Sequence, residues 1–166
     1  MYRKRLVARS FTAAVAALAL SSPVAMANTT GAESEITPVQ FKCMALSKAY
    51  LDMSERMPIK IDQVTQLLSA SAEYDASVNE CNVDLQYTVL EKPFVQGIVS
   101  ESGGQMSQGQ AVAFLQSEQG KALIENMMKK QNEAAYEEEE FQGVNFDLTY
   151  TMIGKDLSDM SFRLFE

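Results

Sequence analysis

The sequence predicts an α+β protein in which an antiparallel sheet of about four strands carries helices on one face. Apolar and polar residues alternate over 82–91 and 144–152, as in strands that bury one face. A third alternating run, 160–164, follows a turn after the second. Segments with helical spacing and cap residues precede each strand pair. The predicted order is therefore helix, hairpin, helices, hairpin.

Residues 1–27 have the pattern of a secretory signal peptide. Four basic and no acidic residues occupy positions 1–10, an apolar run follows over 11–20, and Ala25-Met26-Ala27 supplies a cleavage site. The apolar run is shorter than the roughly 20 residues that span a bilayer. We expect cleavage after Ala27, which gives a periplasmic or secreted protein without a membrane span. Residues 28–36 are then a flexible N-terminal segment, and residues 37–166 form a single domain.

The composition excludes several functions. The chain has 166 residues, with 14 Lys and Arg, 22 Asp and Glu, two Cys, and neither His nor Trp. Catalytic triads and metal centres that need histidine are therefore impossible. All four basic residues of the first 27 would leave with the signal peptide, so 28–166 has a net charge of −12. This charge opposes binding to nucleic acid and to anionic membranes, whereas it permits basic partners and cations.

Cys43 and Cys81 are the only cysteines, and we expect them to form one disulfide in an oxidising compartment. A loop of this length gives about 4 kcal/mol of stabilisation in the chain-entropy model. A redox pair is the alternative. It is disfavoured because the chain has no C-x-x-C motif and no histidine to lower a thiol pKa.

The first helix is predicted to start at the N-cap Thr37, with Pro38 in the first helical position, and to run to about Arg56. Its apolar stripe repeats every four residues and is widened by three further side chains. The stripe consists of Phe41, Ala45, Ala49 and Met53, with Leu46, Tyr50 and Met57 beside it.

Residues 59–91 allow two interpretations. Asp62 could cap a second helix that carries Val64, Leu67 and Leu68, but Leu68, Ala70, Ala72 and Tyr74 also alternate as in a strand. Residues 82–91 are a clearer strand, and the polar stretch 75–82 suits a connection between strands. We favour a hairpin that pairs 64–74 with 82–91.

Three helical segments are predicted next. The first lies around 94–99 and ends at Gly103-Gly104, and Ser107 and Ser117 cap the other two. The expected inward residues are Ala111, Val112 and Leu115, then Leu123, Ile124, Met127 and Met128. The last helix should fray at Glu137, Glu138, Glu139 and Glu140, because acids at a helix C-terminus oppose the macrodipole.

The chain ends in a predicted hairpin of two strands, 144–152 and 160–164, joined by a turn over 154–159. Its first strand echoes an earlier segment. Residues 82–92 and 145–155 are identical at six of eleven aligned positions, and the apolar face is kept in both. Either a helix–hairpin unit is duplicated, or two strands of one sheet obey the same pattern.

A loose pattern runs through these segments: residues 57–62 read Met-Pro-Ile-Lys-Ile-Asp, Thr65 and Leu67 follow, and Leu85-x-Tyr87, Gly143-Val144 and Leu148-x-Tyr150 come later. In this the chain resembles small exported bacterial proteins of α+β build whose function is uncharacterised. The resemblance implies a fold and brings no function and no site residues with it.

No motif for catalysis, nucleotide binding or an EF-hand occurs in the sequence, so we expect no catalytic residue and no cofactor. Glu137, Glu138, Glu139 and Glu140 could collect a cation loosely, although a solvated acidic run explains them better. The outer face of the sheet offers Thr88, Thr149 and Thr151 with Asp84 and Asp147, while Tyr87 and Tyr150 belong to the core.

These observations favour a non-catalytic exported protein that acts through protein–protein contacts, such as an adaptor, an inhibitor or an envelope factor. An open sheet face or a free strand edge could bind the partner. The first alternative is an acidic module that binds cations or small ligands. A hydrolase that uses only carboxylates is the second, and it requires two acids in one cleft.

Overall fold

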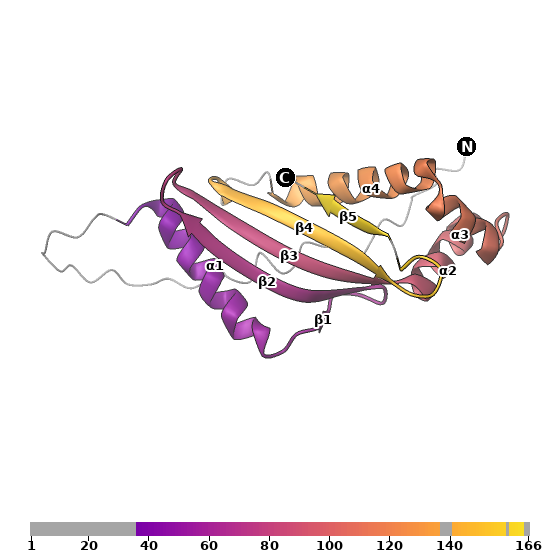
Figure 1. Cartoon of the computed structure of the whole chain (residues 1–166), viewed down its shortest axis with the longest axis horizontal. Helices are drawn as coiled ribbons and strands as arrows, with labels where there is room; N and C mark the ends of the chain where they lie inside the picture. The colour runs from indigo at the N-terminus through magenta and orange to yellow at the C-terminus, as the bar shows by residue number, and fades with distance from the viewer. Residues whose placement is uncertain (1–35, 137–140, 159, 165–166) are drawn as a thin grey trace, which may run out of the picture.

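The computed structural model describes residues 36–136, 141–158 and 160–164, which form four helices and one mixed sheet of five strands (Figure 1). The strands lie in the sheet in chain order, β1-β2-β3-β4-β5. The elements are α1 (Pro38–Ser54), β1 (Ile59–Lys60), β2 (Thr65–Asp75), β3 (Glu80–Leu90), α2 (Glu91–Glu101), α3 (Gln108–Gln116), α4 (Glu118–Tyr136), β4 (Val144–Ile153) and β5 (Ser161–Leu164).

The predicted α+β class is confirmed, but the predicted sheet was wrong in two respects. It has five strands because the short β1 pairs with the start of β2, and it is mixed because β3 and β4 run parallel. The two hairpins, β2–β3 and β4–β5, are as predicted. The connection through α2, α3 and α4 returns the chain to the end of the sheet where β3 began, and such a long crossover permits parallel pairing.

α1 begins as predicted, since the Thr37 hydroxyl accepts a hydrogen bond from the Gln40 N–H at 3.1 Å. The face that it buries differs from the predicted stripe, because Cys43, Leu46 and Tyr50 are buried whereas Phe41 is half exposed. Cys43 forms the predicted disulfide with Cys81, with the two Cα atoms 5.4 Å apart. This bond turns the Cys43 side of the helix toward the sheet and leaves Phe41 outside.

The part of residues 59–91 that could have been a helix forms the strand β2 instead. Asp62 does cap the backbone there, but its Oδ1 accepts from the N–H groups of Val64 and Thr65 at the turn that leads into β2. The predicted alternation fails at Leu68, which is exposed because the register of β2 shifts between Leu67 and Ser69. From Ala70 onward the alternation follows the prediction.

The helical caps agree with the sequence. Ser107 and Gln110 form a reciprocal capping box, and the Ser117 hydroxyl accepts from the Gly120 N–H. In α4 only Ile124 and Met128 of the four predicted inward residues are buried. The other two, Leu123 and Met127, are exposed, so α4 buries only part of its predicted apolar face. The predicted fraying at 137–140 lies outside the described residues.

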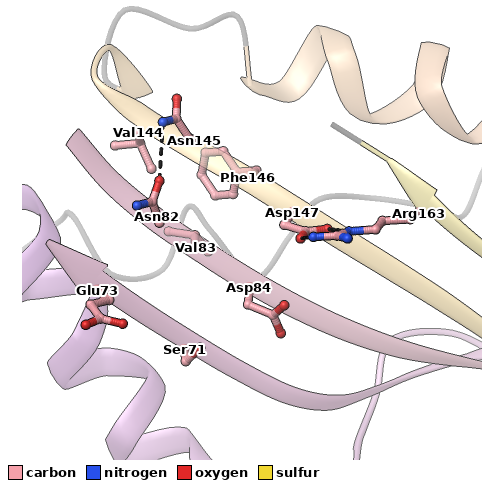
Figure 2. A pocket seen from close by; sticks show the side chains of 10 residues that line it. All are labelled: Ser71, Glu73, Asn82, Val83, Asp84, Val144, Asn145, Phe146, Asp147 and Arg163. Atoms are coloured by element: carbon pink, nitrogen blue, oxygen red, sulfur yellow. Dashed lines mark hydrogen bonds and ion pairs between the residues drawn. The ribbon is translucent and has the colours of Figure 1, made fainter. Parts of the chain in front are cut away.

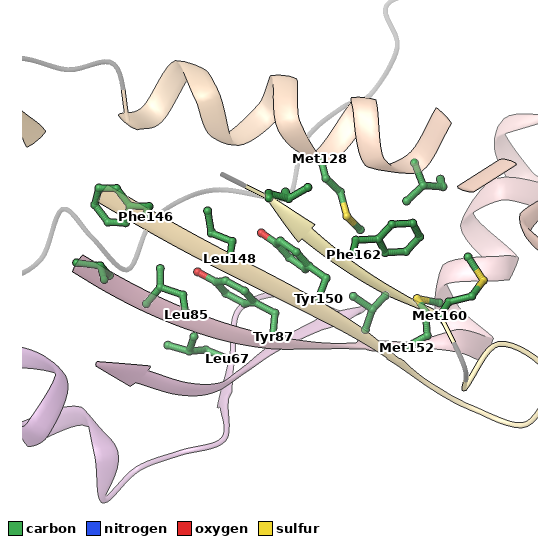
Figure 3. Packing of buried hydrophobic residues seen from close by; sticks show 14 of the residues in the cluster. Leu67, Leu85, Tyr87, Met128, Phe146, Leu148, Tyr150, Met152, Met160 and Phe162 are labelled. Carbon is green, nitrogen blue, oxygen red and sulfur yellow. The ribbon is translucent and has the colours of Figure 1, made fainter. Parts of the chain in front are cut away.

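The two faces of the sheet differ in composition. One face, the core face, carries the buried side chains Cys81, Val83, Leu85, Tyr87 and Val89 of β3 and Phe146, Leu148, Tyr150 and Met152 of β4. α1 and α4 pack against this face, where Met128 lies over Phe162 (Figures 1 and 3). The alternate residues form the opposite face, here called the polar face, which includes Asn82, Asp84, Asn145, Asp147 and Arg163.

The sequence echo coincides with the parallel pairing of β3 and β4. The register places Asn82 beside Asn145, Asp84 beside Asp147, Leu85 beside Leu148, Tyr87 beside Tyr150 and Thr88 beside Thr151. β3 is the second strand of its hairpin, whereas β4 is the first strand of its own. The echo therefore reflects two neighbouring strands under one pattern rather than a duplicated helix–hairpin unit.

Candidate functional site

The polar face is hollowed at the end where β3 and β4 begin (Figure 2). The hollow has a volume of about 900 Å³ and is open to solvent. Three strands supply most of its wall, and β5 contributes one side chain. The lining residues are Ser71, Glu73, Asn82, Val83, Asp84, Val144, Asn145, Phe146, Asp147 and Arg163.

Arg163 and Asp147 form the ion pair of the hollow. The Arg163 Nε donates to both carboxylate oxygens of Asp147 at 3.0 Å, and a terminal guanidinium nitrogen also contacts Oδ2. The pairing of β5 with β4 sets this geometry, because Thr149 and Arg163 are partners in the register. The planar guanidinium holds the carboxylate in one orientation.

Asp84 lies directly beside Asp147 in the parallel register, and two like charges in that position repel each other. The positive charge of Arg163 compensates the negative charge of Asp147. Among the described side chains, Asp84 has no such partner and accepts only a hydrogen bond from the Gln86 side-chain amide at 3.2 Å. Glu73 enters the hollow from β2, opposite Asn82. Within the described part of the chain, neither Asp84 nor Glu73 has a basic partner, so the hollow keeps an excess of negative charge.

A pair of amides closes the end of the hollow. The Asn145 Nδ2 donates to the Glu80 carboxylate at 2.8 Å and to the Asn82 side-chain oxygen at 3.3 Å. These bonds join the starts of β3 and β4 on the polar face. The register that places Tyr87 beside Tyr150 on the core face thus also orders the polar groups on the polar face.

The hydrophobic core contains buried tyrosine hydroxyls that are not part of the hollow. Burial raises the pKa of Tyr50 to about 12. Burial also raises the pKa of Tyr150 to about 12, although a hydrogen bond from Asn132 opposes the rise and the negative charge of Asp62 adds to it. The Tyr50 hydroxyl has no hydrogen-bond partner among the described residues. Both tyrosines are therefore neutral members of the core at physiological pH.

Only some of the candidate residues predicted from the sequence lie at the hollow. Asp84 and Asp147 do lie on the polar face, but Thr88 is almost fully buried between Gln66 and Thr151 and offers no contact. Glu137, Glu138, Glu139 and Glu140 fall outside the described residues. Among the residues that the structure describes, no group of three or more acidic or cysteine side chains is arranged to hold a metal ion.

Sequence reasoning missed the contributions of Glu73, Asn82, Asn145 and Arg163 to this site. The echo between 82–92 and 145–155 could have pointed to the two asparagines, because identical residues at matching positions become neighbours when two strands pair in register. Nothing in the sequence indicated that Arg163 would reach Asp147.

No family model matches the sequence, and neither a curated protein nor a solved structure is significantly similar to it. None of the helices within 36–136 is long and apolar enough to cross a membrane. The class is therefore defined by the structure: an α+β protein with a mixed sheet, helices over one face and an acidic hollow on the other.

Proposed function

We propose that this chain is a non-catalytic exported binding protein that recognises a basic segment of a partner protein through the polar face of its sheet. The single observation that carries the proposal is the hollow on that face, in which Glu73 and Asp84 lack basic partners within the described residues. A cationic side chain that entered the hollow would supply the missing charge.

The charge of the whole chain supports the same partner. Residues 28–166 have a net charge of −12, so a basic partner is attracted before contact and an acidic one is repelled. The polar side chains of the lining can hydrogen-bond to a protein partner, and a typical interface contains about ten direct hydrogen bonds.

The proposed site of action is outside the cytoplasm. The Cys43–Cys81 disulfide fits an oxidising compartment. The signal-peptide pattern of residues 1–27 adds support. Fractionation of the producing cells, with mass spectrometry of the N-terminus, should find the protein in the extracytoplasmic fraction with Asn28 as its first residue.

The test of the binding site is crosslinking in the producing cells. We expect the unaltered protein to be captured with one partner, and the double variant Glu73→Gln/Asp84→Asn to lose most of that product. The matched control is Asp52→Asn/Glu55→Gln, which removes two negative charges from exposed positions on and just after α1, away from the hollow. If both double variants lose the product equally, net charge rather than the hollow determines binding and the proposal fails.

A thermal-shift screen distinguishes the cation-binding alternative. Divalent cations should shift the melting temperature of the unaltered protein no more than they shift that of Glu73→Gln/Asp84→Asn. A stabilisation that requires both carboxylates would replace the proposed protein partner with a metal ion.

A further inference from the structure

β2 has an edge that is mostly unpaired. Only Gln66 and Leu67 pair with β1, and within the described chain no strand lies beside the segment from Ser69 to Asp75 on that side. The other edge of the segment pairs with β3 along its whole length. Seven residues of extended backbone therefore have no strand of the described chain on that side, although α1 packs against β2 (Figure 1).

The hydrogen bonds show which residues turn toward this open edge. The Cys81 N–H donates to the Gly143 carbonyl, so Cys81 directs its backbone groups toward β4 and away from β2. Its antiparallel partner, Tyr74, forms a non-hydrogen-bonded pair with it and therefore directs its own N–H and C=O outward. By the alternation of the ladder, Ala72 and Ala70 do the same.

Lysine, proline and a bulge, three of the features that protect free edges, are missing from residues 69–75. The segment does carry the charges of Glu73 and Asp75, and α1 packs against β2. Natural edge strands carry lysine, proline or a bulge that prevents pairing with another chain. Residues 69–75 read Ser-Ala-Ser-Ala-Glu-Tyr-Asp, which includes no lysine and no proline, and the register shift lies before Ser69. The small side chains leave room for a neighbouring backbone.

The edge adjoins the hollow. Ser71 and Glu73 line the hollow and belong to the same segment whose other residues present the open backbone. A strand added at this edge would place every second side chain on the polar face, next to Glu73. Those side chains must be cationic to match the charge there.

We propose that the partner binds by strand addition: an extended segment with Lys or Arg at alternate positions pairs with residues 69–75 of β2 and directs its cationic side chains onto the polar face. This inference rests on the proposed function and specifies its mode. Backbone hydrogen bonds supply affinity in such complexes, and the alternate side chains supply specificity. A second copy of this chain is a poor occupant, because its own β2 would bring Glu73 and Asp75 to an acidic surface.

The test uses three peptides of ten residues that alternate Lys and Thr: one unmodified, one N-methylated on every Thr and one N-methylated on every Lys. All three have the same charge, but each methylated form lacks the N–H groups on one edge. We expect the unmodified peptide to bind the disulfide-bonded protein in calorimetry and to shift the amide resonances of Ala70, Ala72 and Tyr74. Exactly one methylated form should bind at least tenfold more weakly, the Thr form for antiparallel addition and the Lys form for parallel addition.

A variant of the protein provides an independent check. Ala72→Pro removes an outward N–H without breaking a bond to β3, so it should lose peptide binding while Ala72→Val keeps it. Equal affinity for all three peptides would overturn strand addition, yet it would leave recognition of basic segments by the polar face intact. Binding of none of them would also overturn strand addition, and the proposed function would then be judged by the crosslinking result alone.

Discussion

Tyr87 and Tyr150 stack with their ring centroids 4.7 Å apart and their planes 11° from parallel (Figure 3). They occupy matching positions in the two echoed segments and are partners in the parallel register of β3 and β4. The stack therefore joins the two hairpins at the centre of the sheet, where neither hairpin alone could form it.

This stack should be measurable as a coupling energy. In a double-mutant cycle of Tyr87→Leu and Tyr150→Leu, each single variant is expected to lower the free energy of unfolding by about 1–3 kcal/mol. The coupling should be about 0.5–1.5 kcal/mol, as for other aromatic pairs. Urea denaturation gives all four values, and additivity of the two single effects would show that the rings do not stabilise each other.

The two buried tyrosines of the core should respond differently to loss of the hydroxyl. Tyr50→Phe removes a buried hydroxyl that lacks a partner in the described structure, so we expect unfolding free energy to stay the same or rise by about 1 kcal/mol. Tyr150→Phe removes the hydrogen bond with Asn132 and should lower it by about 1 kcal/mol. A loss at Tyr50 as large as that at Tyr150 would reveal a partner for its hydroxyl.

The raised pKa values of Tyr50 and Tyr150 predict how the stability of the protein changes at alkaline pH. Their pKa values are about 12 in the folded protein and 10.0 in the unfolded chain, so the folded state binds these protons more tightly. The contribution of the two tyrosines to the free energy of unfolding is therefore complete below pH 10, and it is lost as the pH rises toward 12. Each tyrosine accounts for roughly 2–3 kcal/mol over that range. Denaturation between pH 9 and 12 should show a shallower decline for Tyr50→Phe, and parallel curves would contradict the assignment.

The disulfide should provide a large share of the stability. Cys43 and Cys81 are 38 residues apart, and the chain-entropy model gives about 4 kcal/mol for closing such a loop. Cys43→Ala/Cys81→Ala should therefore lower the unfolding free energy by about that amount. Reduction of the unaltered protein is the control, since it breaks the same bond without removing side chains. A change below about 1 kcal/mol in both would show that α1 is held to the sheet by packing alone.

Two glycines in helices should give opposite results when replaced by alanine. At Gly120 in α4, a Cβ would lie 2.0 Å from the Phe114 carbonyl oxygen, so Gly120→Ala should destabilise the contact of α3 with α4 by more than 1 kcal/mol. At Gly97 in α2, nothing lies within 4 Å of the added atom. Gly97→Ala should stabilise by about 0.5–1 kcal/mol, as expected in a helix interior. Thermal denaturation of the two variants would show melting temperatures that move in opposite directions.

The local features of this fold could be read from the sequence because they depend on neighbouring residues. The Thr37, Ser107 and Ser117 caps satisfy N–H groups three residues away, and the alternation in β3 and β4 follows from the period of a strand. The cysteine pair was equally determined, since each cysteine had one possible partner. Composition alone also excluded histidine chemistry.

Contacts between distant segments were decided only by the tertiary structure. The rotation of α1, which buries Cys43 and exposes Phe41, depends on where Cys81 lies in the sheet. The parallel pairing of β3 with β4 depends on how the three helices between them return the chain. That pairing places Asp84 beside Asp147, and β5 then brings Arg163 to Asp147, so the hollow exists only once both hairpins have joined. Hydrophobic pattern specifies which face of a strand is buried, but it does not specify which strand will be its neighbour.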